Sequence, residues 1–193
     1  MRMPNVFLIG GHAGSGKTEL SRALARLTGW ALLDKDTISQ PLTEAALIAL
    51  GESPVSRESK SYRTLIRPRE YEALLAAMYE NLRCGVSTIA AAPFLTEFAD
   101  SGWVRQLRAS CAELSASLRI VWVHCDPETM QNRIKVRNQA RDSAKLSNWD
   151  SYLAGIDLGF RPATAHDAID NSASSIEDVQ SQARALLTRL RND

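Results

Sequence analysis

The sequence predicts an α/β fold in which helices cover both faces of a five-stranded parallel sheet. Short apolar runs alternate with stretches of helical periodicity along the chain, and this alternation is typical of parallel sheets. A glycine-rich turn directly joins the first apolar run to the first helical stretch. With 193 residues and 45% hydrophobic side chains, the chain can bury one such core, and no repeat or linker divides it. We therefore expect a single domain over residues 1–193.

The first half of the chain contains three of the expected strands. The strands are short apolar runs, and the helices show apolar residues three and four positions apart, with glycine or proline near their ends. In chain order, we expect a strand at 6–9, a helix from Leu20 to Gly29, a strand at 30–33, a helix at 38–50, an irregular segment at 51–67, a helix from Pro68 to Gly85 and a strand at 86–92.

The second half completes the sheet. Asp126 followed by Pro127 is a strong helix start, because aspartate caps helices and proline is favoured at the first helical position. We expect Ser147 and Ser175 to cap two further helices. In chain order, the expected elements are a mostly helical stretch at 94–114, a strand at 118–125, the helix after Asp126, a short helix after Ser147, a strand at 165–169 and a last helix after Ser175.

Residues 11–18 read GHAGSGKT and match the pattern G-x-x-x-x-G-K-[ST] of the phosphate-binding P-loop. The pattern lies between a predicted strand and a predicted helix, which is the context that a P-loop requires. Glycines let main-chain amides wrap around phosphate oxygens, and the helix N-terminus attracts the same anion. A glycine-rich turn that matches by chance is the alternative. We therefore expect a three-layer P-loop NTPase fold that binds a nucleotide through Gly11, His12, Ala13, Gly14, Ser15, Gly16, Lys17 and Thr18.

Four side chains beside this loop have expected roles in chemistry. Lys17 would reach the β- and γ-phosphates of ATP, and the Thr18 hydroxyl would bind Mg²⁺. Asp34 and Asp36 follow the second strand, at the sheet edge where ligands bind in open α/β folds. We expect Asp36 to accept the proton of an attacking hydroxyl and Asp34 to serve the metal, although the reverse assignment stays open. The alternative is that an aspartate here, Asp36 in particular, only caps the next helix.

Arginines four residues apart follow the Asp126 cap. Arg133, Arg137 and Arg141 share one helix face if the helix continues that far. On a mobile lid over about residues 126–150, such arginines would close on the transferring phosphoryl group and stabilise its charge. We expect Arg133 and Arg137 to be catalytic, and Arg133 also to bind the nucleotide. The alternative is an ordinary solvated basic face.

The segment at about 38–67 is expected to bind the phosphate acceptor. It holds basic side chains and a tyrosine, namely Arg57, Lys60, Tyr62, Arg63 and Arg67. A pocket lined by these side chains would suit a polar or anionic, ring-bearing acceptor, whereas the alternative is a plain surface loop.

Composition excludes several classes of partner. The net charge is +1, no apolar run approaches the ~20 residues of a membrane span, and aromatic and basic residues do not alternate. We therefore expect no nucleic acid and no membrane as partner. Three scattered cysteines and the lack of a signal-peptide pattern favour a reduced, cytoplasmic protein. The third strand ends Ala90-Ala91-Ala92, without the carboxylate of motor-type P-loop proteins, which favours a small kinase.

The segments GGHAGSGKT, LLDKDTI, CDPE and IDNS, in this order, resemble those of small P-loop phosphotransferases. This group includes shikimate and gluconate kinases, chloramphenicol phosphotransferase and the zeta-toxin kinases. The resemblance implies that Asp36 acts on the acceptor hydroxyl, that Arg133 and Arg137 belong to the lid, and that Asn171 lies near the adenine. Residues 67–71, 92–94 and 141–150 resemble an actinomycete-type subset, some of which phosphorylate antibiotics such as the nucleoside capuramycin in self-resistance.

The sequence thus predicts an ATP- and Mg²⁺-dependent enzyme that phosphorylates a hydroxyl of a small molecule, with a nucleoside-type antibiotic as one candidate acceptor. A nucleotide, nucleoside or metabolite kinase is one alternative, and a non-catalytic nucleotide-binding switch is another. The choice between ATP and GTP, the acceptor and the oligomeric state stay open.

Overall fold

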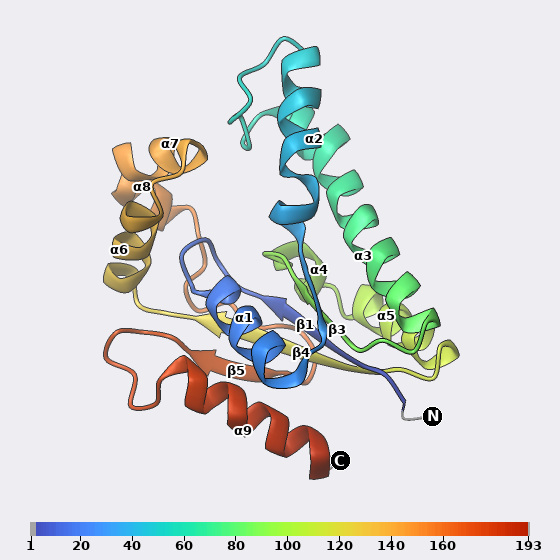
Figure 1. The fold of residues 1–193 in the computed structure, drawn as a ribbon. Coiled ribbons are helices and arrows are strands. Elements are labelled where there is room, and N and C mark those ends of the chain that lie inside the picture. Colours follow the sequence, from blue (N-terminus) through green and yellow to red (C-terminus); the bar gives the residue numbers. More distant parts are fainter. Residues whose placement is uncertain (1–2, 193) are drawn as a thin grey trace.

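The computed structural model describes residues 3–192 of the chain, and within them the strands form a single parallel sheet (Figure 1). The strand order is β2-β3-β1-β4-β5, so the strand before the P-loop is central. The strands are β1 (Asn5–Gly10), β2 (Ala31–Asp34), β3 (Thr88–Ala91), β4 (Ser117–His124) and β5 (Asp167–Asp170). This sheet confirms the predicted fold class, and the predicted strand positions agree with it to within about two residues.

Helices cover both faces of this sheet, as predicted (Figure 1). They are α1 (Lys17–Thr28), α2 (Lys35–Ala49), α3 (Arg67–Arg83), α4 (Leu95–Ala99), α5 (Ser101–Glu113), α6 (Pro127–Arg137), α7 (Ser143–Ser147), α8 (Trp149–Ala154) and α9 (Val179–Asn192).

The alternation of side chains along β1 divides the core in two. Val6 and Leu8 point to one face, where α3 and α5 pack, whereas Phe7 and Ile9 point to the other, where α1 and α9 pack. All four side chains are buried, which is expected of a central parallel strand. Both layers therefore hold β1 in place, and β1 in turn fixes the start of the P-loop.

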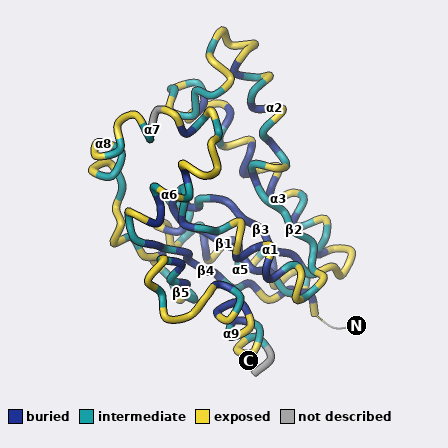
Figure 2. The backbone as a smooth tube through the Cα atoms, turned by 60° about the vertical axis from the view of Figure 1, so that its left-hand side comes forward, coloured by how far each residue is buried: buried dark blue, intermediate teal, exposed yellow. Residues whose placement is uncertain are grey.

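Two helical extensions rise beyond the sheet at its carboxyl edge. One, which we call the arm, contains α2, the loop after it, a π-helical turn at Tyr62–Ile66 and α3; the other, the lid, contains α6, α7 and α8 (Figure 1). Strands β1, β3 and β4 are largely buried, whereas the loop beyond α2 consists of exposed and half-buried residues (Figure 2). Within residues 3–192, no helix is both long enough and apolar enough to cross a membrane.

Two expectations about the arm are wrong in detail. The helix expected from residue 38 begins at Lys35, because the Asp34 carboxylate accepts hydrogen bonds from the amides of Asp36 and Thr37 at 3.0 and 3.2 Å. Asp34, rather than Asp36, is thus the cap of this helix. The segment at 51–67 is not irregular throughout, since its last turn is helical and continues into α3.

Both predicted serine caps are also wrong. Ser147 is the last residue of α7, and Asn148 precedes α8. The last helix begins after Asp178, whose carboxylate accepts from the Ser181 amide at 2.7 Å, whereas the Ser175 hydroxyl donates to the Glu177 carbonyl. Asp178 is placed one residue before the helix, so its carboxylate can satisfy an amide of the first turn that Ser175 cannot reach.

Candidate active site

The P-loop connects β1 to α1 at the carboxyl edge of the sheet. Gly14 and Gly16 adopt φ angles of 79° and 92°, in the left-handed region that favours glycine. A Cβ atom on Gly16 would lie 1.9 Å from Nδ2 of Asn171, so a larger residue would also collide with the loop after β5. Conformation and close packing therefore both require the last glycine of the motif.

Asn171 and Arg133 brace the loop from the side of β5. The Asn171 amide donates to the Ser15 carbonyl at 3.2 Å, and the Arg133 guanidinium donates to the Asn171 carbonyl at 2.7 Å. Asn171 is buried, so its side chain serves the loop. Asn171 thus braces the P-loop, whereas the sequence resemblance implied a place near the adenine, and Arg133 of α6 reaches the same loop. The Ser15 hydroxyl is buried and has no hydrogen-bond partner among the described residues, so it is available to a phosphate oxygen.

Lys17 and His12 are held by carbonyl groups. Lys17 Nζ donates to the His12 carbonyl at 2.8 Å, and burial, reinforced by Arg137 and opposed by Asp36, lowers the pKa of Lys17 to about 8. His12 Nε2 lies 2.9 Å from the Asp157 carbonyl, and burial lowers the pKa of His12. The neutral His12 ring thus holds the P-loop against the segment after α8. Only the backbone of His12, and not its side chain, is then free to face a nucleotide.

The affinity for ATP is expected to depend on the charge of Lys17. In the free protein its pKa is about 8, and a bound polyphosphate would raise it. By proton linkage, the affinity should stay level below about pH 8 and fall by up to about tenfold per pH unit above it. Calorimetric titration with ATP between about pH 7 and pH 10 checks this, and a flat profile up to pH 10 would contradict it.

Thr18 and Asp34 supply the oxygen atoms expected of a magnesium site. The Thr18 hydroxyl donates to Asp34 Oδ2 at 3.4 Å, while Oδ1 of the same carboxylate caps α2. Hydroxyl and carboxylate oxygens are ligands that fit Mg²⁺. No group of three or more His, Cys, Asp or Glu side chains within residues 3–192 could hold a metal by itself. The pair therefore fits an ion that takes its remaining ligands from phosphates and water.

Asp36 lies between the arm and the lid. Its Oδ1 is 3.0 Å from Lys35 Nζ, and its Oδ2 is 2.7 Å from the Arg141 guanidinium. Burial alone would raise the pKa of Asp36, but Lys35 and Arg141 outweigh it and hold the pKa at about 2. Asp36 is therefore ionised at neutral pH, and 37% of its side chain is exposed.

Arg133 and Arg137 lie four residues apart on α6, but the helix does not continue to Arg141, so the condition for all three arginines to share one face is not met. Helix α6 ends at Arg137 because Asn138 turns left-handed with φ 46°, and Arg141 lies in a 3₁₀ turn beyond it. Arg137 donates to the buried Asp142 at 3.0 Å. Arg141 instead reaches back to Asp36, and this contact brings the lid and the arm together.

A cleft of about 890 Å³ joins these groups. The predicted catalytic and metal-binding side chains line it together, namely Lys17, Thr18, Asp34, Asp36, Arg133 and Arg137. Sequence reasoning missed several further lining residues, among them Arg22, Arg26, Gln40 and Gln180. Arg22 and Arg26 follow Thr18 at intervals of four, so the helical spacing could have placed them on the same face.

The arm does not form the basic pocket that the sequence suggested. The Arg57 guanidinium and the Tyr62 hydroxyl both donate to the buried Glu70 carboxylate, at 2.6 and 2.8 Å. Arg67 pairs with Glu97 at 2.9 Å, and Lys60 and Arg63 are exposed. Arg57 is thus neutralised inside the arm and Arg67 by Glu97 of α4, and neither side chain lines the cleft.

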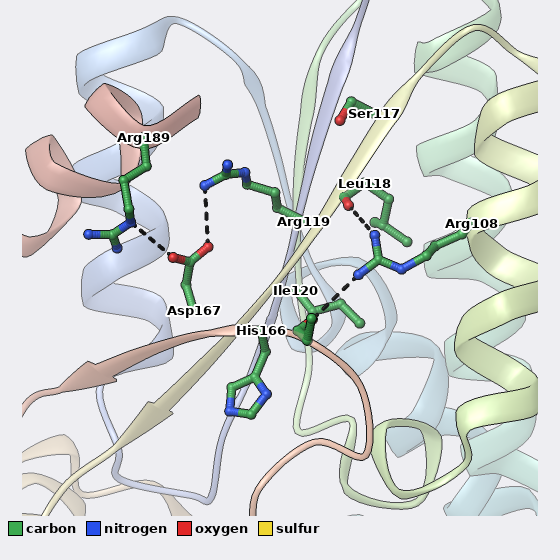
Figure 3. A pocket seen from close by; sticks show the side chains of 9 residues that line it. Arg108, Ser117, Leu118, Arg119, Ile120, His166, Asp167 and Arg189 are labelled. Atoms are coloured by element: carbon green, nitrogen blue, oxygen red, sulfur yellow. Dashed lines mark hydrogen bonds and ion pairs between the residues drawn. The ribbon is translucent and has the colours of Figure 1, made fainter. Parts of the chain in front are cut away.

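A second cavity, of about 540 Å³, lies where β4 and β5 begin, at the edge of the sheet away from the P-loop (Figure 3). Asp167 accepts from Arg189 at 3.0 Å and from Arg119 at 3.5 Å, and Arg108 donates to the Leu118 carbonyl at 2.8 Å. Its arginines hold parts of the protein together, and we assign this cavity no part in nucleotide binding.

A family model described as an AAA domain matches residues 6–158. The chain belongs to this AAA domain family. The matched range begins in β1 and ends beyond α8, so it includes the P-loop, the arm and the lid of this AAA domain. No curated protein sequence matches the chain.

Among solved structures, this AAA domain resembles small P-loop kinases. A provisionally assigned kinase from Chloroflexus aurantiacus j-10-fl matches with a TM-score of 0.71 and 22% identity, over 100% of this chain and 98% of that one. A gluconokinase from Sinorhizobium meliloti 1021 matches with a TM-score of 0.59 and 20% identity, over 100% of this chain and 96% of that one. The Mycobacterium tuberculosis APS kinase CysC, solved with AMPPNP and APS, matches with a TM-score of 0.57 and 16% identity, over 99% of both chains. These likenesses confirm the predicted P-loop kinase fold.

Proposed function

We propose that the protein is an ATP-dependent phosphotransferase that moves the γ-phosphoryl group to a hydroxyl of a small molecule. The observation that carries this proposal is the single cleft in which Lys17 and Thr18 of the P-loop face the ionised Asp36. A site that only sensed ATP would not need an ionised carboxylate in the same cleft as the P-loop lysine. The names of the structural neighbours, which include a gluconokinase and an APS kinase, support the same class of reaction.

Each side chain has a defined part in this reaction. Lys17, Arg133 and Arg137 bind the phosphates and stabilise the charge that develops on the transferred group. Thr18 and Asp34 would hold Mg²⁺, which supplies further neutralisation of phosphate charge when bound. Asp36 accepts the proton of the acceptor hydroxyl as its oxygen bonds to the γ-phosphorus, while the bond from that phosphorus to the β–γ bridging oxygen breaks and ADP leaves.

The acceptor is proposed as a class, with nucleoside-type antibiotics among the candidates alongside sugars and other metabolites. We expect the reaction to take place in the cytoplasm, without nucleic acid or membrane. Purified protein with ATP and Mg²⁺ is tested against panels of sugars, nucleosides and antibiotics, and mass spectrometry detects a product heavier by one phosphoryl group. GTP in place of ATP shows which purine the site prefers.

The decisive result is acceptor-dependent consumption of ATP with a phosphorylated product. Slow ATP turnover that no acceptor accelerates would contradict the proposal and favour a nucleotide-sensing role. A mock preparation from cells that do not express the protein serves as the matched blank, since a product formed equally by both preparations would come from a contaminating kinase.

A further inference from the structure

Lys35 is a buried cation shared by two carboxylates. Its ammonium donates to Glu70 at 2.7 Å and lies 3.0 Å from Asp36 Oδ1, and only 5% of its side chain is exposed. The ammonium also lies 5.9 Å from the centre of the Tyr71 ring, within the range of a cation–π contact. Two carboxylates and an aromatic face therefore surround the ammonium.

Glu70 fixes this ammonium in place. Its carboxylate, with 2% of the side chain exposed, accepts hydrogen bonds from side chains of α2, of the loop and of the π-helical turn. The donors are Lys35, Ser39, Thr43, Arg57 and Tyr62, at distances from 2.6 to 3.1 Å. A buried carboxylate with donors on both oxygens has one well-defined orientation, and so does the ammonium bound to it.

The contact from Lys35 to Asp36 depends on this anchor. Adjacent side chains on a helix diverge, so Lys35 meets Asp36 only because its long side chain bends towards Glu70 and passes the neighbouring carboxylate. Lys35 holds Oδ1 of Asp36, whereas Oδ2 pairs with Arg141 of the lid, and both Asp36 and Arg141 line the cleft.

We propose that Lys35, anchored by Glu70, is a positioning residue that orients Asp36 so that Oδ2 meets the acceptor hydroxyl. This inference rests on the proposed function. Lys35 is buried and is not among the residues that line the cleft, so it acts through Asp36. Arg141 occupies Oδ2 in the free protein, so the acceptor must displace it, whereas the bond from Lys35 to Oδ1 stays in place during the reaction.

The test replaces Lys35 by methionine, which keeps the length of the side chain and removes its charge. Arg57 remains bound to Glu70 in this variant, so that buried carboxylate keeps a cationic partner. We expect kcat to fall by about 10- to 100-fold, with KM for ATP unchanged, because a displaced base costs rate rather than nucleotide affinity. The exposed Arg83 of α3, in the same arm, provides the control, and Arg83→Met should keep wild-type kcat and melting temperature. Lys35→Arg should restore part of the lost rate.

A double-mutant cycle separates positioning from a general structural role. If Lys35 acts through Asp36, then Lys35→Met should cause no further loss in a protein that already carries Asp36→Asn. Multiplication of the two losses would overturn the proposal, and so would an unchanged kcat in the single variant.

A crystal structure of the Lys35→Met variant gives a readout without turnover. The Asp36 carboxylate is expected to rotate away from its wild-type orientation, while the P-loop and the Glu70–Arg57 pair stay in place. An Asp36 side chain that keeps its orientation would overturn the proposal. Failure of the proposed function would be seen differently, as a wild-type protein that phosphorylates no acceptor although its structure is intact.

Discussion

Replacement of Asp36 by asparagine is expected to lower kcat by about 10²- to 10⁴-fold, the usual contribution of a general base. Asparagine has nearly the same size, but its amide can neither accept the proton nor pair with the Lys35 and Arg141 cations. The affinity for ATP should change little, since Asp36 lies on the acceptor side of the cleft. Steady-state rates with a saturating acceptor, together with calorimetric titration of ATP, check both parts.

The control for Asp36→Asn is Asp150→Asn, which removes the same charge from an exposed position of the lid. This variant should retain the wild-type kcat. If Asp36→Asn retained it as well, Asp36 would have no part in the reaction, and Asp34 would become the carboxylate to examine.

Replacement of Lys17 by methionine is expected to reduce kcat/KM for ATP by at least about 10²- to 10³-fold, as is typical when a charge-stabilising donor is removed. The ammonium is the cation of the loop itself, and its partner in the free protein, the His12 carbonyl, would remain in place without it. Radiometric or coupled assays over a range of ATP concentrations measure the loss.

The same variant also isolates the origin of the pH dependence. Because the group with a pKa of about 8 is absent, the decline of ATP affinity above that pH should disappear in Lys17→Met. If ATP affinity declined equally steeply in the wild type and in Lys17→Met, the pH dependence would belong to another titrating group. Arg83→Met, which removes an exposed cation outside the cleft lining, should behave like the wild type in both assays.

The fold and the nucleotide end of the site could be predicted because their causes are local in the sequence. The last glycine of the P-loop, Gly16, has a left-handed backbone, and the strand before it and the helix after it show clear periodicity. Parallel strands place their carboxyl ends at one edge, so the position of Asp36 near Lys17 also followed.

The acceptor end could not be predicted, because it depends on contacts between distant residues. Arg57 reads as a free cation in the sequence, but in the fold it pairs with Glu70, which is thirteen residues away. Arg141 reads as a continuation of a helix, but a left-handed Asn138 ends that helix and redirects Arg141 to Asp36. A pattern of charges does not reveal which of them neutralise one another on folding.

The polar bonds to Glu70 have a consequence for how selectivity can change. The hydrophobic cluster of the arm is small, with Leu47, Tyr62 and Ile66 at its centre, so directional bonds to one carboxylate set the angle between α2 and α3. The outer loop at 51–56 contributes no side chain to these bonds, and its residues are exposed or half-buried. The length and composition of this loop could therefore vary among related proteins without a change in the positions of Lys35 and Asp36.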